Sequence, residues 1–283
     1  MPHPVMSPNN VAVIMGGASG IGFAAAQRFA RLGMKVCVAD LGADRLSAAE
    51  AELKSTSPGG AANVMTMAVD VSRAEDVSKV EAAVRDRFGG TDILMNNAGI
   101  QPGSTMFGPS ENWLRVLAVN LWGVIHGSQI FAPRMIERGR PGLIINTGSK
   151  QGITTPPGDP AYNVSKAGLK AFTEALEHEL RNTKPGLITA HLLIPGFVFT
   201  GLTAKGRTEK PAGAWTAEQT VDFMVERLEA GDFYILCPDN DTPRRLDERR
   251  MLWAMGDIVE NRPALSRWHP DYADAFAKFA KES

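Results

Sequence analysis

The sequence predicts an α/β fold in which one doubly wound domain has a seven-stranded parallel sheet with helices on both faces. Short, uninterrupted apolar runs carry the first part of this prediction, because they are typical of strands buried on both faces of a parallel sheet. Helical segments separate successive runs. Strand–helix alternation sustained over seven strands is typical of a parallel sheet covered on both sides.

The first strand is expected at residues 11–16 (VAVIMG), and a helix follows over GFAAAQRFARLG, where Gly33 is well placed as the C-terminal cap. Further strands are expected at residues 35–40, 63–70, 92–99, 142–149, 187–196 and 233–237. The longest helices are expected over residues 111–138 and 161–184. Ligands of such sheets bind beyond the carboxyl ends of the strands.

The chain ends and loops suggest a simple domain organisation. Residues 1–10 lack a basic region followed by an apolar stretch, so we expect a flexible arm rather than a secretory signal. Residues 11–238 are expected to form the catalytic domain, with a mobile substrate loop at about 200–216. Residues 239–283 are expected to be a C-terminal extension packed on the same domain. The longest apolar window, 186–199, is too short to span a bilayer, so the sequence predicts a soluble cytoplasmic protein.

Composition limits the possible functions. Of the 283 residues, 44% are hydrophobic and 22% are charged, which is ordinary for a soluble globular enzyme. The formal net charge of −1 gives no electrostatic reason to expect nucleic acid or an anionic membrane as a partner. The two cysteines, Cys37 and Cys237, lie in apolar runs and are expected to be buried and reduced, and no spacing indicates a metal site.

A glycine-rich turn, GGASGIG, joins the first strand to the first helix. Gly16, Gly20 and Gly22 permit a tight turn and a close approach of the backbone to a pyrophosphate, whose charge would face the positive end of the helix. Glycines also occur in turns that bind nothing. The position between a buried strand and an amphipathic helix favours a nucleotide site of the Rossmann type.

Asp40 ends the second strand, where a carboxylate can accept hydrogen bonds from the adenosine ribose hydroxyls and repel a 2′-phosphate. A compensating cation would be needed for NADP(H), but neither Ser19 nor Leu41 is basic. Arg45 is the nearest candidate, and a solvated helix face is enough to explain it. The sequence therefore predicts NAD(H).

The segment AYNVSKAG contains one of only three tyrosines. On a helix Tyr162 and Lys166 would share one face, although this spacing alone can arise by chance. A free tyrosine has a pKa near ~10 and is a poor base at neutral pH. A nearby ammonium and a positive nicotinamide ring both favour phenolate and would lower the pKa of Tyr162.

The motifs together resemble those of the short-chain dehydrogenase/reductase family in order and spacing. They are Gly16-x-x-x-Gly20-x-Gly22, NNAG at 96–99, Asn120 in VNLWG, Ser149 after IINTG, Tyr162-x-x-x-Lys166 and PGFVFT at 195–200. The resemblance covers about residues 11–200. It implies that Tyr162 exchanges a proton with a carbonyl or alcohol substrate and that Ser149 hydrogen-bonds the substrate oxygen. It also implies that Lys166 binds the nicotinamide ribose and that Asn120 holds a water linking Lys166 to solvent.

The resemblance also implies the cofactor contacts. Asp70 and Val71 would flank the adenine, residues 97–99 would pass beneath the adenosine ribose, and Thr200 with the Val198 backbone would fix the carboxamide. The full set expected to contact the cofactor is Gly16, Ser19, Gly20, Ile21, Gly22, Asp40, Leu41, Asp70, Val71, Asn97, Ala98, Gly99, Tyr162, Lys166, Pro195, Gly196, Val198 and Thr200. The expected catalytic set is Asn120, Ser149, Tyr162 and Lys166.

By this resemblance we expect an NAD(H)-dependent enzyme that interconverts a secondary alcohol and a ketone. Phe197, Phe199 and Trp215 suggest a bulky, apolar or aromatic substrate. The two long helices at 111–138 and 161–184 are expected to form the contact of a dimer or tetramer. The alternative is a non-catalytic, NAD-binding interaction protein on the same fold.

Some residues depart from the family pattern. Met15 stands where threonine is usual, which puts the rigidity of the glycine turn in doubt. Lys150 directly follows the catalytic serine, and we interpret it as a solvated lysine rather than a group that meets an anionic substrate. Trp253 and Trp268 in the extension could line a pocket, pack the extension or bury a subunit contact; packing is the default.

Overall fold

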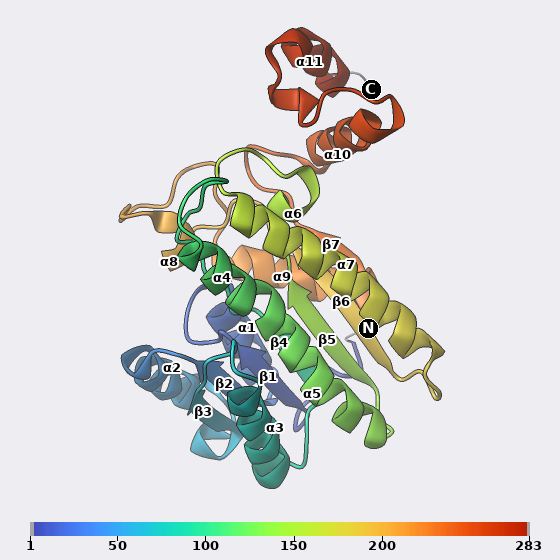
Figure 1. Ribbon diagram of the computed structural model, residues 1–283. Helices are drawn as coiled ribbons and strands as arrows, with labels where there is room; N and C mark the ends of the chain where they lie inside the picture. Colours follow the sequence, from blue (N-terminus) through green and yellow to red (C-terminus); the bar gives the residue numbers. More distant parts are fainter. Residues whose placement is uncertain (1–2, 282–283) are drawn as a thin grey trace.

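Seven parallel strands form one sheet in the order β3-β2-β1-β4-β5-β6-β7 (Figure 1) in the computed structural model, which describes residues 3–281. The strands are β1 Val11–Met15, β2 Lys35–Asp40, β3 Val64–Ala68, β4 Ile93–Asn96, β5 Gly142–Thr147, β6 Ile188–Ile194 and β7 Tyr234–Leu236. The fold class and all seven predicted strands are confirmed. Most strands end before the polar and glycine residues that the sequence analysis assigned to them, and these residues lie in the loops at the strand ends.

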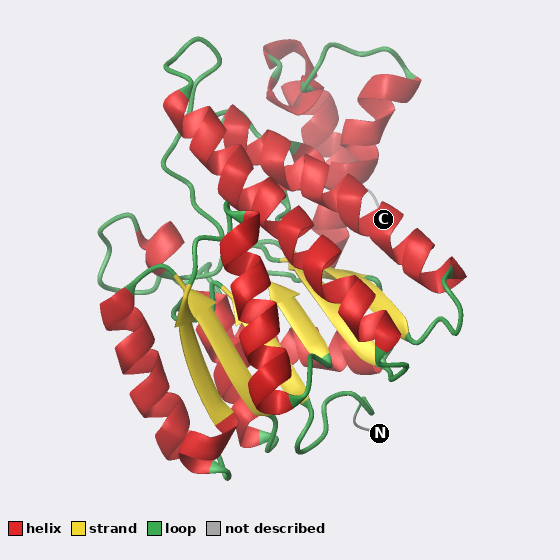
Figure 2. Cartoon of the chain, turned by 60° about the horizontal axis from the view of Figure 1, so that its bottom comes forward, coloured by secondary structure: helices red, strands yellow, loops and turns green. Residues whose placement is uncertain are grey.

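Helices cover both faces of the sheet (Figure 2). Helices α1, α2 and α9 pack beside one another on one face, and α3, α5 and α7 lie on the other. The helices are α1 Gly20–Arg31, α2 Ala43–Thr56, α3 Ala74–Phe88, α4 Glu111–Leu117, α5 Gly123–Glu137, α6 Gln151–Thr154, α7 Pro160–Asn182, α8 Gly201–Ala204, α9 Ala217–Glu229, α10 Arg244–Val259 and α11 Ala273–Lys281. Among residues 3–281, none of the helices is both long and apolar enough to cross a membrane.

The sheet divides the apolar core into two layers because side chains alternate along each strand. Ile14 of β1 belongs to the cluster that includes Ala25 and Leu228, whereas its neighbour Val13 belongs to the cluster that includes Val77 and Phe131. Odd- and even-numbered residues of β1 are therefore both buried. This explains why the strands read as continuous apolar runs rather than as an alternating pattern.

The predicted helix over residues 111–138 is not continuous. A π-helical turn, Ala118–Trp122, separates α4 from α5, and Pro133 lies inside α5. Such turns hold one residue more than the α-helical pattern and are frequent at functional sites. The turn carries Asn120, which is fully buried.

After the edge strand β3 the chain returns to the middle of the sheet, where β4 pairs with the free edge of β1. Strand β1 has β2 on one side and β4 on the other, so connections leave their carboxyl ends in opposite directions. A crevice forms at this switch point, and it is the usual ligand site of open α/β sheets.

The segment before β1 lies against the body of the domain. Val5 and Met6 are buried in the core, with exposures of 2% and 4%. The Asn9 amide donates to the carbonyl of Gly33, which follows α1 with a φ of 77°. These contacts hold residues 5–10, which we expected to form a flexible arm, beside the end of α1.

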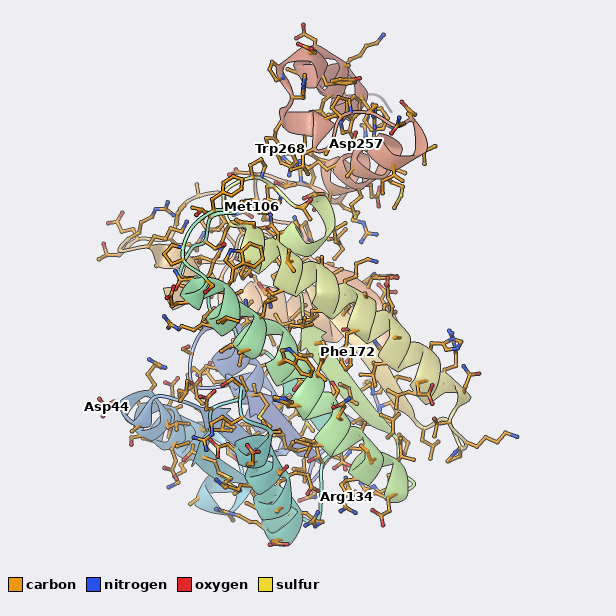
Figure 3. The ribbon with its side chains drawn as sticks, viewed as in Figure 1. Asp44, Met106, Arg134, Phe172, Asp257 and Trp268 are labelled. Atoms are coloured by element: carbon orange, nitrogen blue, oxygen red, sulfur yellow. The ribbon has the colours of Figure 1, made fainter. Side chains whose placement is uncertain are left out.

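The C-terminal extension forms a helical lobe on the side of the sheet that carries the strand carboxyl ends (Figure 1). Trp253 of α10 is 5% exposed, and its ring packs edge-on against Phe276 and Phe279 of α11. Asp257 and Trp268 also belong to this lobe (Figure 3), and Trp268 is 39% exposed. Trp253 thus packs the extension on itself, and α10 meets the rest of the chain at α6.

Candidate active site

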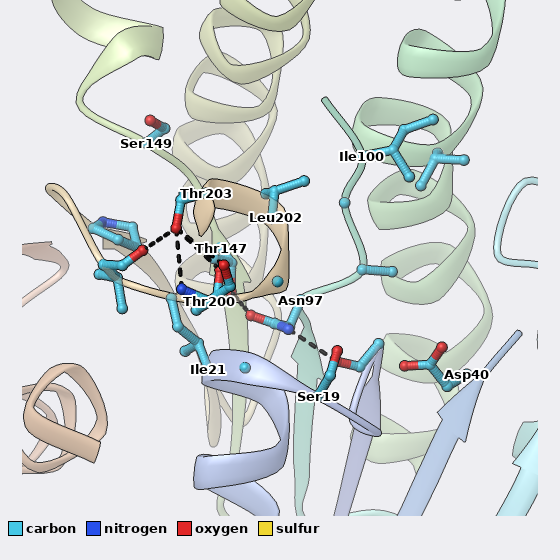
Figure 4. Close-up of a pocket in the computed structure, with 18 of the residues that line it drawn as sticks. Ser19, Ile21, Asp40, Asn97, Ile100, Thr147, Ser149, Thr200, Leu202 and Thr203 are labelled. Carbon is cyan, nitrogen blue, oxygen red and sulfur yellow. Dashed lines mark hydrogen bonds between the residues drawn. The ribbon is translucent and has the colours of Figure 1, made fainter. Parts of the chain in front are cut away.

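The predicted site residues gather at one cavity of about 280 Å³ at the carboxyl ends of the strands (Figure 4). All of them line it except Gly22 and Asn120. Figure 4 shows Asp40 and Ser149 toward opposite ends of the pocket. The cavity therefore has room along the crevice for an extended ligand that crosses the switch point.

The glycine turn provides a cradle that larger residues would fill. Gly16 has a φ of 76°, and a Cβ there would lie 2.5 Å from the Cα of Ala98. A Cβ on Gly22 would lie 2.2 Å from the carbonyl oxygen of Gly16. Gly22 consequently allows α1 to pack directly beneath the turn, and this explains why it does not line the cavity. Met15, in place of the usual threonine, is buried under the turn.

The amino end of α1 is open toward the cavity. Ser19 is the N-cap residue, yet its side chain makes no capping hydrogen bond, and the first turn holds no acidic residue. Ser19, Gly20 and Ile21 all line the cavity. Unpaired amide groups at the positive end of a helix are a ready site for an anion, so this end of the cavity fits a pyrophosphate.

Asp40 lies at the end of β2 and is held by backbone donors. Its Oδ1 accepts from the Leu41 amide at 2.8 Å, and its Oδ2 accepts from the Ala18 amide at 3.1 Å. Arg45 Nη2 lies 3.4 Å from Asp40 Oδ1 and Arg45 lines the cavity. The interpretation of Arg45 as part of a solvated helix face alone was therefore incomplete, since the arginine also reaches the carboxylate that would select the dinucleotide.

Asn97 ties three strand ends together beneath the cavity (Figure 4). Its Nδ2 donates to the Gly16 carbonyl at 3.0 Å, and its Oδ1 accepts from the Thr147 hydroxyl at 3.1 Å. These bonds link the ends of β1, β4 and β5. They fix the turn that Met15 was expected to leave less rigid.

Tyr162 and Lys166 lie on one face of α7, as the spacing predicted. Tyr162 is 7% exposed and Lys166 is 4% exposed, and both line the cavity with Ser149. Lys166 Nζ donates to the Thr147 carbonyl at 2.7 Å and lies 5.7 Å from the centre of the Tyr162 ring. Three of the four side chains of the predicted catalytic set are thus brought together at the cavity.

Burial dominates the acid–base properties of this pair. It lowers the pKa of Lys166 to about 8, because the ammonium is removed from water. Burial also raises the pKa of Tyr162, and a hydrogen bond with Ser149 opposes this rise. The expected lowering of the Tyr162 pKa by Lys166 is therefore wrong for the protein groups alone, since desolvation of the phenol outweighs every other contribution.

Asn120 lies behind the cavity rather than in its lining. Its Oδ1 accepts from the Ile100 amide at 2.8 Å, and its Nδ2 donates to the Ile100 carbonyl at 2.9 Å. A Cβ on Gly99 would lie 3.6 Å from Asn120 Oδ1 and 3.9 Å from Lys166 Nζ. Asn120 thus fixes the loop after β4 at the point where Lys166 approaches it.

The segment after β6 closes the cavity from the other side. Thr203 Oγ1 accepts from the Thr200 amide at 3.0 Å and donates to the Val198 carbonyl. A Cβ on Gly20 would lie 3.2 Å from the Thr200 side chain, so this segment touches the glycine turn.

Several lining residues were not predicted. They are Arg45, Val69, Ile100, Val119, Thr147, Gly148, Gly201, Leu202 and Thr203. Thr147 and Gly148 directly precede Ser149 and could have been found by adjacency, whereas no sequence signal marks Ile100 or Val119. Phe197, Phe199 and Trp215, which suggested an aromatic pocket, do not line this cavity. Trp215 instead packs edge-on against Phe223, at 5.7 Å between ring centres.

Lys150 is not the solvated lysine that we expected. Its side chain is 16% exposed and forms ion pairs with Asp239 and Asp247 of the C-terminal region.

Within residues 3–281, no group of three or more His, Cys, Asp and Glu side chains could hold a metal ion.

Comparison with known proteins gives concordant matches. The model of the short chain dehydrogenase family matches residues 10–211. The 1-deoxy-11-beta-hydroxypentalenate dehydrogenase of Streptomyces exfoliatus is 32% identical, over 91% of this chain and 93% of its own.

Two solved structures are also similar. A short chain dehydrogenase/reductase from Burkholderia phymatum in complex with NAD has a TM-score of 0.81 and 30% identity, covering 92% of this chain and 97% of its own. The L-sorbose reductase of Gluconobacter frateurii, complexed with NADPH and L-sorbose, has a TM-score of 0.68 and 29% identity, covering 78% of this chain and 90% of its own. Nicotinamide cofactors of both kinds thus occur among similar structures.

Proposed function

Because the chain belongs to the short-chain dehydrogenase family, we propose that it is an NAD(H)-dependent oxidoreductase that interconverts a secondary alcohol and a ketone. The observation that carries this proposal is the convergence of Ser149, Tyr162 and Lys166 on the cavity whose other end holds the glycine cradle. Substrate and dinucleotide would therefore meet beside side chains that are suited to proton transfer at a carbonyl.

The roles of the three side chains follow from their environment. Tyr162 would give its proton to the ketone oxygen during reduction and take it back from the alcohol during oxidation. Ser149 would donate a hydrogen bond to the same oxygen as negative charge develops on it. Lys166 would hold the nicotinamide ribose hydroxyls and place a positive charge near the phenol. A bound nicotinamide would supply or accept the hydride.

This proposal is tested by mixing the purified protein with NADH or NADPH and a panel of ketones, or with the oxidised cofactors and secondary alcohols, while following nicotinamide absorbance. Turnover that depends on substrate supports it. Cofactor binding without turnover across a broad panel supports the second candidate, a non-catalytic NAD-binding interaction protein. The buried catalytic set favours the enzyme, because an interaction protein has little need of it.

Asp40 supports the preference for NAD(H), since its carboxylate lines the end of the cavity where an adenosine ribose would lie. We expect Asp40→Ala to raise the ratio of kcat/KM with NADP(H) to that with NAD(H) by about 10- to 100-fold, which corresponds to about 1.4–2.8 kcal/mol. The change removes the repulsion of a 2′-phosphate and frees Arg45 to pair with it. Initial rates with both cofactors measure the ratio.

Two further variants define the cause of that shift. Asp40→Ala/Arg45→Ala should lose most of the gain with NADP(H), because no cation remains beside the ribose. Asp44→Ala removes an exposed carboxylate that does not line the cavity, and it should leave the ratio unchanged. An unchanged ratio in Asp40→Ala would contradict the cofactor assignment.

We also propose a cytoplasmic homo-oligomer. Two buried free thiols suit a reducing compartment. Leu114, Trp122 and Val164 are large apolar residues with exposures of 65%, 53% and 48%, and they lie on α4, on the π-helical turn and on α7. Apolar side chains gathered on neighbouring helices suit a subunit contact.

Replacing Trp122 with glutamate is expected to shift the protein from dimer or tetramer toward monomer by at least about tenfold in dissociation constant, because a charge would be buried in the contact. Size-exclusion chromatography with light scattering over a dilution series measures this. Leu187→Glu, at an exposed position before β6, is the control and should keep the oligomer. A wild type that is monomeric at every concentration would rule out the contact.

A further inference from the structure

Three charged side chains meet directly behind Ser149. We call Lys150, Asp239 and Asp247 the Lys150 cluster. Lys150 Nζ lies 3.1 Å from Asp239 Oδ2 and 2.6 Å from Asp247 Oδ2, and the three side chains are only 16%, 7% and 5% exposed. Asp239 follows β7, and Asp247 lies in the first turn of α10. The cluster therefore joins the residue next to the catalytic serine to the C-terminal extension.

The cluster also holds the turn after β6, which lines the cavity. Asp239 Oδ2 accepts a hydrogen bond from the Phe197 amide at 3.2 Å, and the Lys150 amide donates to the Pro195 carbonyl at 3.3 Å. A Cβ on Gly196 would lie 2.4 Å from Asp239 Oδ2 and 2.8 Å from Lys150 Nζ. The charged groups thus pack directly on the 195–197 turn with no space between them.

A second set of contacts connects the cluster to Ser149 and to α7. Lys150 is the N-cap residue of the short helix α6. In its first turn the Gln151 amide donates to Ser149 Oγ at 3.2 Å, and the Gly152 amide donates to the Ser149 carbonyl at 3.0 Å. A Cβ on Gly152 would lie 2.5 Å from the carbonyl carbon of Lys166. Helix α6 therefore packs against α7 and also contacts α10. Any movement of α10 that pulled Lys150 would move Ser149 relative to Tyr162.

The charge of the cluster makes a direct role in substrate binding unfavourable. One lysine faces two carboxylates, and Arg250 Nη1 approaches Asp247 Oδ1 at 3.9 Å, so the four groups sum to zero. Lys150 already has two buried partners, and an anionic substrate would have to displace one of them. Such buried pairs are better attested as devices that fix one arrangement of a structure than as sources of stability.

We infer that Lys150 is a positioning residue through which the C-terminal extension holds Ser149 and the 195–197 turn in their places beside Tyr162. This inference rests on the proposed function, because it concerns the geometry of the same reaction. It makes the extension part of the support of the site, although its own apolar core lies apart from the cavity. Lys150 is then not available to bind an anionic substrate, because Asp239 and Asp247 already hold its ammonium.

The test compares Lys150→Met, Asp247→Asn and the double variant in steady-state kinetics with a neutral secondary alcohol and with a hydroxy acid. We expect each single variant to lower kcat for the neutral alcohol by about 10- to 100-fold, because small misplacements of catalytic groups have effects of this size. KM should change by less than about threefold, since the lysine does not touch substrate. The double variant should be no worse than Lys150→Met, because both changes break the same connection.

Asp247→Asn keeps the shape of the side chain, and it tests the inference even if Lys150→Met, which removes the cation between two buried carboxylates, does not fold. Lys170→Met is the matched control, because Lys170 forms an i, i+4 ion pair with Glu174 on α7, away from the cavity. Its kcat should equal that of the wild type.

Two results would overturn the inference. One is an unchanged kcat in Asp247→Asn while the wild type turns over normally. The other is a KM effect confined to the hydroxy acid, raised in Lys150→Met and lowered in Asp247→Asn, because that pattern identifies a lysine that binds a substrate carboxylate. A wild type without turnover on the whole panel would instead refute the proposed function and, with it, this inference.

Discussion

Replacing Tyr162 with phenylalanine is expected to lower kcat by about 10³-fold, within the range that general acid–base catalysis contributes. Tyr162 is 7% exposed and shares the cavity with Ser149, so phenylalanine fills the same space and removes only the hydroxyl that exchanges the proton. Ser149 would still donate a hydrogen bond to the substrate oxygen, but its hydroxyl is far too weak an acid to replace the phenol. Binding of NADH, followed by its fluorescence, should change by less than about twofold.

Tyr234→Phe is the matched control for this experiment. Tyr234 lies on β7, donates to Glu174 and does not line the cavity, so removing its hydroxyl should leave kcat unchanged. If Tyr162→Phe kept more than about a tenth of the wild-type kcat, the acid and base of the reaction would have to be another group.

The fold could be predicted because its signals are local. The central strands β1, β4 and β5 are buried on both faces, so each reads as a short apolar run wherever it stands in the chain. The glycine turn could be placed because position 16 lies so close to Ala98 that only a residue without a Cβ fits there. The Tyr162–Lys166 pair followed from the helical repeat.

Features that depend on contacts distant in sequence were missed. Lys150 looks solvated from its neighbours, because its partners lie at positions 239 and 247. The π-helical turn at Ala118–Trp122 contains no glycine or proline that would break a helix, so residues 111–138 read as one helix. Trp215 suggested an aromatic pocket, but it packs against Phe223, whose position the sequence does not give.

The pKa of Tyr162 shows a different limit. The sequence reveals the charge of Lys166 but not how deeply the two groups are buried. Burial raises the pKa of the Tyr162 phenol and lowers the pKa of the Lys166 amine. A protonated phenol in a dry site is well suited to give a proton to a ketone. A nearby positive nicotinamide ring is the charge that would favour phenolate in the oxidative direction.

Lys166→Met is therefore expected to make the protein inactive and, at pH 7, more stable. Burial lowers the pKa of Lys166 from 10.5 to about 8, and this difference corresponds to about 3 kcal/mol for holding the ammonium in the folded protein. The variant loses the 2.7 Å hydrogen bond to the Thr147 carbonyl, which offsets about 1–2 kcal/mol. The free energy of unfolding at pH 7 should rise by about 1–2 kcal/mol. Turnover should fall by at least about 10²-fold, because the group that holds the ribose and supports the phenol is gone.

The dependence of this gain on pH separates it from ordinary repacking. Below about pH 8 both the folded protein and the unfolded chain hold the Lys166 proton, so the full penalty is present in the wild type. Between about pH 8 and 10.5 the unfolded chain binds more protons, and the stability contributed by this group rises with pH. The advantage of Lys166→Met, measured by urea unfolding at pH 7 and pH 10, should therefore shrink or reverse at the higher pH. Lys170→Met, at a partly exposed ion pair, should show no such gain at pH 7. A Lys166→Met protein that is less stable than the wild type by the same amount at both pH values would contradict this prediction. It would show that burying the Lys166 ammonium does not lower the free energy of unfolding of the wild type.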